Sequence, residues 1–276
     1  MAGRIAPWID RGVLVALTLA GLAQRESALL WYRCLLTAFG ALAGLVLAGA
    51  GLVTLLSARF GERVQGPRIK PALVLRGVLD TARAMWVAAC FAAWPMTMIR
   101  LHQPTGLVWS PPAGPLALAV QTLLALLAMD AWLYWKHRLL HTRLLFPFHR
   151  DHHVYRDPTA FAGFAVGPVE SLLTFWPILL LCIPAATHYA PLYFSLVAAF
   201  VLLNFYLHCG VALGWVEATL PRAFVNTSAF HNQHHANADV NFGEAFTLWD
   251  HLCRTGAKME GWARSRAPTN GSASRP

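Results

Sequence analysis

Long apolar runs alternate with short basic or polar connections along this chain, and they are the first guide to its structure. Runs with at most one charged residue cover 34–57, 84–99, 115–135 and 190–208. About 20 apolar residues in a helix cross the hydrocarbon core of a bilayer, so each run is predicted to be a transmembrane helix. A further run, 171–185, is separated from the last one only by a short turn, which predicts a tight membrane hairpin.

Two segments nearer the N-terminus differ from these runs. Residues 12–23 are apolar but short, and they faintly resemble a signal peptide. Asp10 stands just before them and argues against cleavage, so this segment is expected to lie in the interface or to be half-inserted. Arg76, Asp80 and Arg83 stand at helical spacing, which allows ion pairs. They predict a helix that runs along the surface before the next span.

Composition also favours a membrane protein made of helices. Hydrophobic residues make up 57% of the chain and charged residues 13%, whereas a soluble domain carries roughly 25% charged residues. No stretch of useful length alternates apolar and polar positions as a strand would. Only three of the 22 basic residues are Lys, which favours a GC-rich bacterial genome and thus the inner membrane of a bacterium.

The basic residues predict which side of the membrane each connection faces. The connections at 58–83 and 136–167 and the C-terminal region are basic, whereas 101–114 and 184–191 contain no Lys or Arg. The positive-inside rule assigns the basic segments to the cytoplasm. The formal net charge of +9 is then explained by anionic headgroups rather than nucleic acid. Arginines near the N-terminus place that end inside as well, which requires residues 12–33 to cross or re-enter the membrane.

Nine of the twelve histidines form clusters with ligand-like spacing. Two stand four residues apart, two later clusters both read His-x-x-His-His, and one histidine ends the last span. Imidazole is the commonest protein ligand for a transition metal, and nine imidazoles exceed the need of one ion. The pattern predicts a site for two metal ions with the ligands His137, His141, His149, His152, His153, His208, His231, His234 and His235. The remaining three, His102, His188 and His251, are expected to have structural or surface roles.

The predicted ligands all fall on the predicted cytoplasmic side or at that end of a span. The fold class expected from these patterns is all-α: a multi-pass integral membrane helical bundle with a histidine-rich helical cap on the cytoplasmic side. Three segments are expected along the chain. Residues 1–114 form an N-terminal membrane or interfacial segment with about two spans, 115–256 form the catalytic domain, and 257–276 form a disordered tail.

Ligand type alone leaves the metal open, because imidazole binds zinc, iron, copper and nickel. The chain has neither the His-Glu-x-x-His run of zinc proteases nor the Glu-x-x-His spacing of soluble di-iron bundles. A membrane metal transporter and a structural zinc protein are the alternatives from another functional class. A transporter carries ionisable ligands near mid-membrane, and structural zinc sites are usually four-ligand sets rich in Cys. Both fit the histidine clusters less well than a catalytic site does.

The clusters stand within a longer signature. Residues 130–141 read DAWLYWKHRLLH, FHRDHH and HNQHH follow, and NFG at 241–243 and LWD at 248–250 close the series. In this order the motifs resemble those of the fatty acid hydroxylase/sterol desaturase superfamily, over about residues 115–256. The resemblance implies an integral membrane oxygenase with two iron ions (Fe²⁺), which uses O₂ and two electrons to hydroxylate or desaturate a lipid. It also implies that the nine histidines are the iron ligands.

The resemblance implies partners as well. The substrate would be a membrane lipid, of fatty acyl, sterol-like or other isoprenoid type, that enters from the bilayer. An external electron-transfer protein or reductase would supply the electrons, because 276 residues leave no room for a haem, flavin or ferredoxin domain. A carotenoid-type ring hydroxylase is the alternative within the same chemistry.

Three polar residues are candidates for supporting roles around the metals: Asp130, Asn204 and Asp250. Asp130 lies two helical turns before His137 on the same face, where its carboxylate could fix the tautomer of a ligand. Pairing with Lys136 or a neighbouring Arg is the alternative. Asp250 is expected to do similar work. Asn204 stands where some relatives have a further histidine, and it either holds a metal through water or packs as a helix amide.

Two segments depart from patterns common in the superfamily. Many members carry a His-Pro run with a Glu after the second cluster, whereas residues 167–170 of this chain read GPVE. The closing segment at 249–255 reads WDHLCRT, where Trp-Asp-Arg-x-Phe-Gly-Thr is usual. These departures weaken any close analogy of substrate, and Glu170 is assigned no role.

Overall fold

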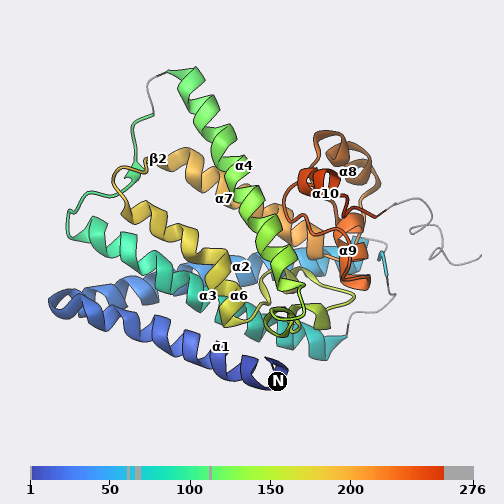
Figure 1. Ribbon diagram of the computed structural model, residues 1–276, viewed down its shortest axis with the longest axis horizontal. Coiled ribbons are helices and arrows are strands. Elements are labelled where there is room, and N and C mark those ends of the chain that lie inside the picture. Colours follow the sequence, from blue (N-terminus) through green and yellow to red (C-terminus); the bar gives the residue numbers. More distant parts are fainter. Residues whose placement is uncertain (1, 61–62, 66–69, 112–113, 258–276) are drawn as a thin grey trace, which may run out of the picture.

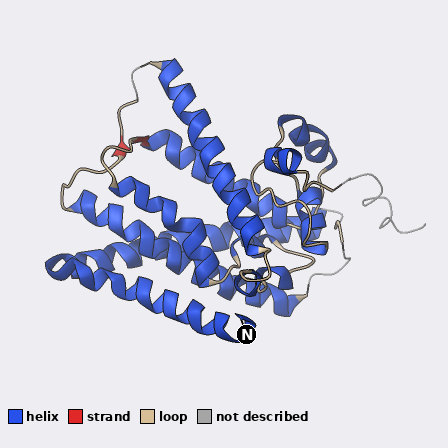
Figure 2. Cartoon of the chain, in the orientation of Figure 1, coloured by secondary structure: helices blue, strands red, loops and turns tan. Residues whose placement is uncertain are grey.

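The computed structural model describes residues 2–60, 63–65, 70–111 and 114–257, and this part of the chain is almost entirely helical (Figures 1 and 2). Four helical segments within it are long and apolar enough to cross a membrane: Gly3–Phe60, Pro71–Arg100, Pro115–Leu140 and Ala190–His208. The predicted all-α, multi-pass fold class is confirmed. Residues 258–276, nearly all of the predicted disordered tail, lie outside the described residues.

The first segment is a helical hairpin. Helix α1 (Ala2–Leu19) leads through a 3₁₀ helix, η1 (Ala20–Ser27), into α2 (Ala28–Phe60). The reversal is sharp, because Arg25 adopts a φ of 48° and Gly21 leaves room for the indole ring of Trp31. Residues 12–19 are therefore part of an 18-residue helix that begins ten residues before the predicted segment. That residues 12–33 cross or re-enter the membrane stays a prediction.

Helix α3 (Pro71–Arg100) is continuous, so the predicted surface helix and the next span are one element. Asp80 pairs with both Arg76 and Arg83 near its start, as the spacing predicted. Small side chains let α3 approach α2 closely, which is common between membrane helices. The buried small residues of this seam include Ala38, Ala43, Ala50, Ala84, Ala88, Ala89 and Ala93.

The remaining long helices carry the site at their ends. Helix α4 (Pro115–Leu140) meets the cap at its C-terminus and diverges from α7 (Ala190–His208) toward its N-terminus (Figure 1). Between them, α6 (Pro168–Phe175) continues into η4 (Trp176–Cys182), and together they are too short to cross alone. The predicted run 171–185 corresponds to this segment, which has the same length but begins and ends three residues earlier, whereas α7 has the predicted bounds.

Two short strands join the connections at the end of the bundle remote from the cap. Strand β1 (Leu107–Val108) pairs in parallel with β2 (His188–Tyr189). Large apolar side chains remain exposed along the long helices, among them Leu45, Leu55 and Leu116. An apolar exterior over helices of this length is what a bilayer requires.

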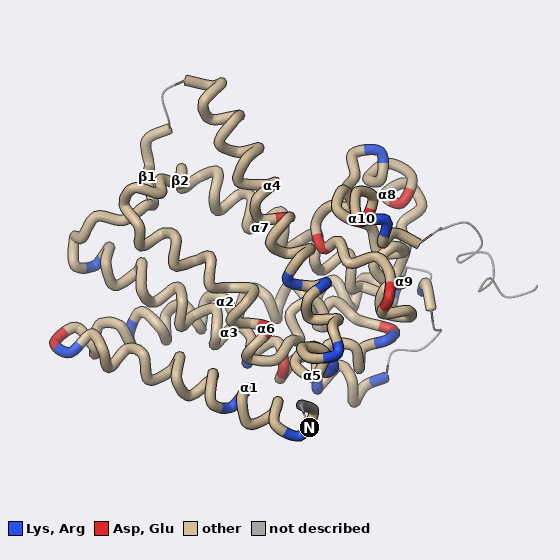
Figure 3. Tube along the Cα trace, in the orientation of Figure 1, with Lys and Arg blue, Asp and Glu red and all other residues tan. Residues whose placement is uncertain are grey.

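Short helices gather at the opposite end, where α2, α4 and α7 finish and α3 and α6 begin (Figure 1). Most charged residues lie at this end too, while the long helices are largely uncharged (Figure 3). One apolar cluster joins α2 and α3 to the cap, because Ala84 and Met85 pack with Phe161 and Phe205. The elements of the cap are α5 (Phe146–His149), η2 (His152–Val154), η3 (Ala160–Phe164), α8 (Gly214–Thr219), η5 (Leu220–Ala223), α9 (Ser228–Ala236) and α10 (Leu248–Cys253).

Candidate metal centre

The nine histidines predicted as ligands converge in the cap, where they form two groups. Each histidine of a group offers one ring nitrogen, and these nitrogens all lie within 4.8 Å of one another. The five-histidine group consists of His137, His141, His149, His153 and His234, and the four-histidine group consists of His152, His208, His231 and His235. His102, His188 and His251 belong to neither group.

Helical spacing explains how the histidines are divided. Residues four apart share a helix face, whereas consecutive residues point about 100° apart. In α9, His231 and His235 therefore belong to one group and His234 to the other. His137 and His141, four apart at the end of α4, likewise share a group.

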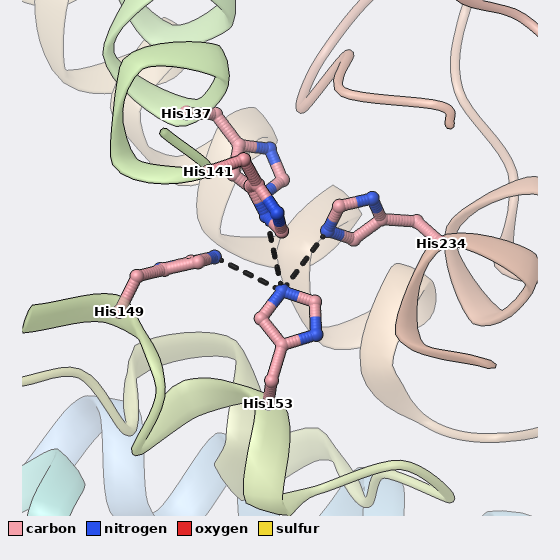
Figure 4. A group of neighbouring side chains, drawn as sticks. All are labelled: His137, His141, His149, His153 and His234. Atoms are coloured by element: carbon pink, nitrogen blue, oxygen red, sulfur yellow. Dashed lines mark hydrogen bonds between the residues drawn. The ribbon is translucent and has the colours of Figure 1, made fainter. Parts of the chain in front are cut away.

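The five-histidine group is centred on His153 (Figure 4). Its Nε2 lies 3.1 Å from Nε2 of His141, 3.1 Å from Nε2 of His149 and 3.2 Å from Nε2 of His234. The ring of His137 completes the group, with its centroid 4.5 Å from that of His234. His141 and His153 are partly exposed, while the other three are buried.

The four-histidine group is enclosed entirely. All its members are buried, and Nε2 of His231 lies 2.9 Å from Nε2 of His208. The two groups touch, because the ring centroid of His153 is 5.3 Å from that of His235. Two ions held by these groups would be neighbours with different access to solvent.

Hydrogen bonds at the outer ring nitrogens set the tautomers. Nδ1 of His137 lies 2.8 Å from the carbonyl oxygen of Phe242, and Nδ1 of His234 lies 2.7 Å from that of Val240. A carbonyl oxygen only accepts, so Nδ1 carries the proton and Nε2 presents its lone pair to the centre. Nδ1 of His208 donates to its own helix in the same way, to a carbonyl oxygen 3.0 Å away. Outer partners of this kind are typical of metal-bound histidine.

Burial keeps these imidazoles neutral, which is the form that binds a metal. It lowers the pKa of His234 to about 4, although the Val240 carbonyl opposes the shift. The pKa values of His149, His231 and His235 are held well below their usual range, first by burial and then by neighbouring imidazoles. The cap therefore presents uncharged nitrogen ligands at neutral pH.

Unsatisfied nitrogens inside the groups suit a bound cation. Nε2 of His137 and both ring nitrogens of His235 are buried without a hydrogen-bond partner in the described part of the chain. An unsatisfied buried polar atom costs roughly 1–3 kcal/mol, and a coordinated metal would remove that cost. Both groups contain histidine alone, so the donor set fits a transition metal that accepts imidazole.

Glu170 is the functional candidate that sequence reasoning missed. It lies in the first turn of α6, is 3% exposed, and its Oε2 accepts a hydrogen bond of 2.7 Å from Nδ1 of His149. The signal was an acidic residue at the start of an apolar run, which by default marks a functional position. Its partner could not be identified, because α6 and α5 are brought together only by the tertiary fold.

Asp250 acts on the centre through the backbone. Its carboxylate accepts hydrogen bonds from the amides of Phe242 (2.9 Å) and Gly243 (2.7 Å) and from the Thr255 hydroxyl (2.6 Å). The carbonyl of Phe242 in turn holds His137. Asp250 thus fixes a loop that orients a predicted ligand.

The Asn-Phe-Gly run forms this loop for clear local reasons. Asn241 adopts a φ of 60°, which Asn tolerates better than most residues, and its side chain donates to Gln233 of α9. A Cβ atom at Gly243 would meet the Asp250 carboxylate at 2.8 Å. The motif therefore joins α9, the loop and Asp250 into one rigid unit.

Asp130 and Asn204 lie close to the same elements. Asp130 accepts a 3.0 Å hydrogen bond from the amide of Phe246, so its bond in the described part of the chain is to the loop backbone and not to an imidazole. The backbone carbonyl of Asn204 accepts the bond from His208, while its side-chain Oδ1 is buried without a partner among the described residues. Whether either residue takes part in metal binding stays a prediction.

A cavity opens beside the two groups, where α4, α6 and α7 enter the cap. Its polar wall includes histidines of both groups, and its apolar wall includes Phe164, Phe175, Phe200 and Leu207. Lys136, Glu170 and Glu244 also line it. The cavity has a volume of about 40 Å³, so it has room for water-sized groups beside the histidines and not for a whole lipid.

Comparison with known proteins decides the family. The model of the family described as "Fatty acid hydroxylase" matches residues 122–255, which carry all nine clustered histidines. The match covers just under half of the chain, and over this segment the chain is similar to the fatty acid hydroxylase family. The resemblance inferred from the motifs is confirmed.

Proteins that are similar to this chain include enzymes named for sterols. Lathosterol oxidase of Homo sapiens is 30% identical over 200 residues, which cover 67% of this chain and 62% of the relative. Lathosterol oxidase of Mus musculus is 34% identical over 150 residues, covering 51% and 46%. Delta(7)-sterol 5(6)-desaturase ERG3A of Gibberella zeae is 33% identical over 152 residues, covering 52% and 39%. The chain thus spans less than two thirds of the length of these relatives, and no solved structure matches it.

Proposed function

We propose that the chain is an O₂-dependent oxidoreductase that hydroxylates or desaturates a membrane lipid at a site holding two iron ions. The two groups of neutral histidines carry this proposal, because they offer nine nitrogen ligands beside a cavity with apolar walls. The five-histidine group would hold one ion and the four-histidine group the other. The catalytic region would correspond to residues 115–256, with the N-terminal helices as its membrane support.

Iron supplies the redox chemistry with O₂ that attacks unactivated C–H bonds, which acids, bases and nucleophiles leave untouched. The chain's own residues orient the ligands and exclude water. Glu170 and the Phe242 carbonyl keep the Nδ1 protons of His149 and His137 directed away from the centre. Phe164 and Phe200 provide the apolar wall against which a lipid would lie.

A sterol-type lipid is the first substrate class to test. The relatives named above are, by their names, a lathosterol oxidase and a Delta(7)-sterol 5(6)-desaturase. The apolar wall of the cavity and the position of the cap at the ends of membrane helices support a substrate that arrives from the bilayer. The arginine distribution supports a cytoplasmic cap in a bacterial inner membrane, and electrons would come from an external donor protein.

Metal content and O₂ consumption test this proposal directly. Protein purified in mild detergent from iron-supplied cells is expected to hold about two irons per chain and to consume O₂ with a reductant and total membrane lipid. His152→Ala and His234→Ala each remove one ligand, from different groups, and are expected to lower iron content and abolish lipid-dependent consumption. His251→Ala is the matched control, since His251 is exposed and lies outside both groups.

Other results would redirect the proposal. Zinc has no redox chemistry, so a stable zinc content with no O₂ consumption after iron loading would favour a structural or transport role. Iron that turns over O₂ without changing any lipid would retain the metal centre and reject the substrate class.

A further inference from the structure

A buried ion pair lies beside the histidines, and in the described part of the chain no hydrogen bond joins it to one of them. Nζ of Lys136 is 2.8 Å from Oε1 of Glu244, with side-chain exposures of 3% and 15%. The same ammonium donates to Oγ1 of Thr174 at 3.1 Å. All three side chains line the cavity beside the metal centre.

Structural support alone does not explain this ammonium. Desolvating an ion pair costs free energy that its attraction often fails to recover, so a buried pair is weak evidence of a stabilising role. The loop that carries Glu244 is already held by Asp130 at Phe246 and by Asp250 at Phe242. The ion pair therefore adds little to what already holds the loop in place. Its position in the cavity wall needs another explanation.

The ammonium retains hydrogen-bonding capacity toward the cavity. A lysine ammonium has three N–H donors, and among the described residues Nζ of Lys136 has two partners, Glu244 and Thr174. The third N–H is available to an acceptor in the cavity that Lys136 lines. Hydrogen bonds from a charged donor are stronger than neutral ones, and most of all where water is excluded.

We propose that Lys136 is a specificity-determining residue that binds a neutral oxygen atom, a hydroxyl or carbonyl, on the lipid substrate. Charge favours a neutral group, because Glu244 already balances the ammonium and the carboxyl of Glu170 lines the same cavity. A carboxylate or phosphate of the lipid would add a further negative charge there. This assignment rests on the proposed function and narrows its substrate class.

The position of Lys136 also limits which carbon is oxidised. It directly precedes His137, and Oε1 of Glu244 lies only 4.0 Å from Nδ1 of that histidine. Lys136 shares a cavity of only about 40 Å³ with histidines of both groups, so an oxygen bound there would lie within a few bonds of a carbon that faces those histidines. The substrate class is a lipid alcohol or ketone oxidised close to its oxygen, as distinct from an acyl chain oxidised near its middle.

Equilibrium binding to the full-length, iron-loaded protein, measured without O₂, tests the assignment. The probes are two pairs that differ only in the oxygen: cholest-7-en-3β-ol with cholest-7-ene, and 1-octadecanol with octadecane. We expect the wild-type protein to bind at least one alcohol about tenfold more tightly than its hydrocarbon partner, the order of one hydrogen bond to a charged group. Lys136→Met, similar in length but uncharged, is expected to reduce that ratio to about one while leaving hydrocarbon binding unchanged.

Two further variants separate recognition from packing. Glu244→Gln keeps the ammonium and is expected to keep or raise the preference for the alcohol. Trp135→Phe is the control beside Lys136, because Trp135 is 43% exposed and does not line the cavity. Iron content and elution as a single species confirm that each variant is folded.

Several outcomes would overturn the assignment. The assignment is wrong if the wild-type protein binds alcohol and hydrocarbon equally, or if it binds neither alcohol. Both results come from the wild-type protein, so they hold even if Lys136→Met fails to fold. Equal weakening of both probes in Lys136→Met, or loss of the preference in Glu244→Gln, makes the pair structural. The proposed function is tested separately, and it is contradicted if iron-loaded protein consumes no O₂ with any lipid. The ratio of alcohol binding to hydrocarbon binding does not depend on that result.

Discussion

At the residue scale, the hydrogen bond at the outward ring nitrogen of a histidine determines whether the inward nitrogen has a lone pair free for a metal. Backbone carbonyls hold the outer nitrogens of His137, His208 and His234, and Glu170 holds that of His149. Carbonyl partners cannot be removed by substitution. Glu170 is therefore the position at which this outer layer can be tested by a side-chain change.

Glu170→Gln is expected to weaken metal binding without unfolding the protein. Gln can still accept the hydrogen bond from Nδ1 of His149, but its amide group cannot become the carboxylate that would strengthen this bond when a metal is bound. Changes to such outer partners typically cost 10–100-fold in metal affinity, so we expect about tenfold for Gln and more for Ala. Competition for iron against a chelator series measures the change.

Glu26→Gln provides the control for this prediction. Glu26 is exposed in η1, at the end of the bundle remote from the cap, so its substitution should leave iron retention unchanged. Identical retention in wild type and Glu170→Gln would contradict a role for Glu170 in positioning His149.

Sequence reasoning at this scale identified the histidines that converge but not what holds them. Ligand spacing is local and appears in the sequence as His-x-x-His-His. The bond from His149 to Glu170 joins separate elements, and Asp250 acts through two backbone amides of a loop. Contacts of this kind depend on tertiary packing and leave no periodic signal.

At the element scale, the close approach of η3 to α7 places the last membrane histidine. Gly163 of η3 lies directly against the Asn204 side chain of α7, and a Cβ atom there would collide with Asn204 Oδ1. Nδ1 of His208 would also be only 3.2 Å from that Cβ atom. The absence of a side chain at this position allows α7 to bring His208 into the four-histidine group.

Gly163→Ala is therefore expected to displace α7 and reduce occupancy of the four-histidine group. Overpacking a buried contact typically costs about 1–3 kcal/mol, so we expect a lower Tm and an iron content nearer one per chain than two. Gly51→Ala is the matched control, because its nearest neighbour would be at an ordinary 3.7 Å. Full iron content and an unchanged Tm in Gly163→Ala would contradict this prediction, because they would show that α7 can shift without loss of stability or of ligand geometry.

The bounds of a helix were predicted correctly where one uninterrupted apolar run forms it. They were not predicted where the helix depends on packing against a second segment. Helix α7 coincides with its apolar run, since nothing interrupts residues 190–208. Helix α1 was misjudged because Pro7 and Asp10 interrupt its apolar pattern. In the structure, Oδ1 of Asp10 accepts a bond from the amide of Val169 at the start of α6, a partner far along the chain.

At the scale of the whole molecule, burying so many neutral imidazoles makes stability depend on pH. The pKa of His234 is about 4 in the folded protein, below the ordinary value of 6.5. Above pH 6.5 both folded and unfolded states are neutral at this residue. Between pH 6.5 and about 4 only the unfolded state takes up the proton, so stability is lost as the pH falls, by up to about 1.4 kcal/mol per pH unit for each such histidine.

The Tm of metal-free protein, prepared with a chelator, is expected to fall steadily between pH 7.5 and 5. His234→Asn removes one contributing group and should make the decline shallower. His251→Asn, at an exposed position, should leave the slope as it is. A Tm independent of pH over this range would contradict the burial of neutral imidazoles in the metal-free state.

The position of α9 in the sequence determines when, during synthesis of the chain, the metal centre can be completed. It supplies His234 to one group and His231 and His235 to the other, and it follows every membrane-crossing helix in the described chain. During translation, therefore, neither group is complete until the last membrane helix has left the ribosome. Both complete ligand sets therefore form only after the spans are made, so full metallation is a late step of biosynthesis. A chain truncated before α9 would retain its membrane helices and lack both complete ligand sets.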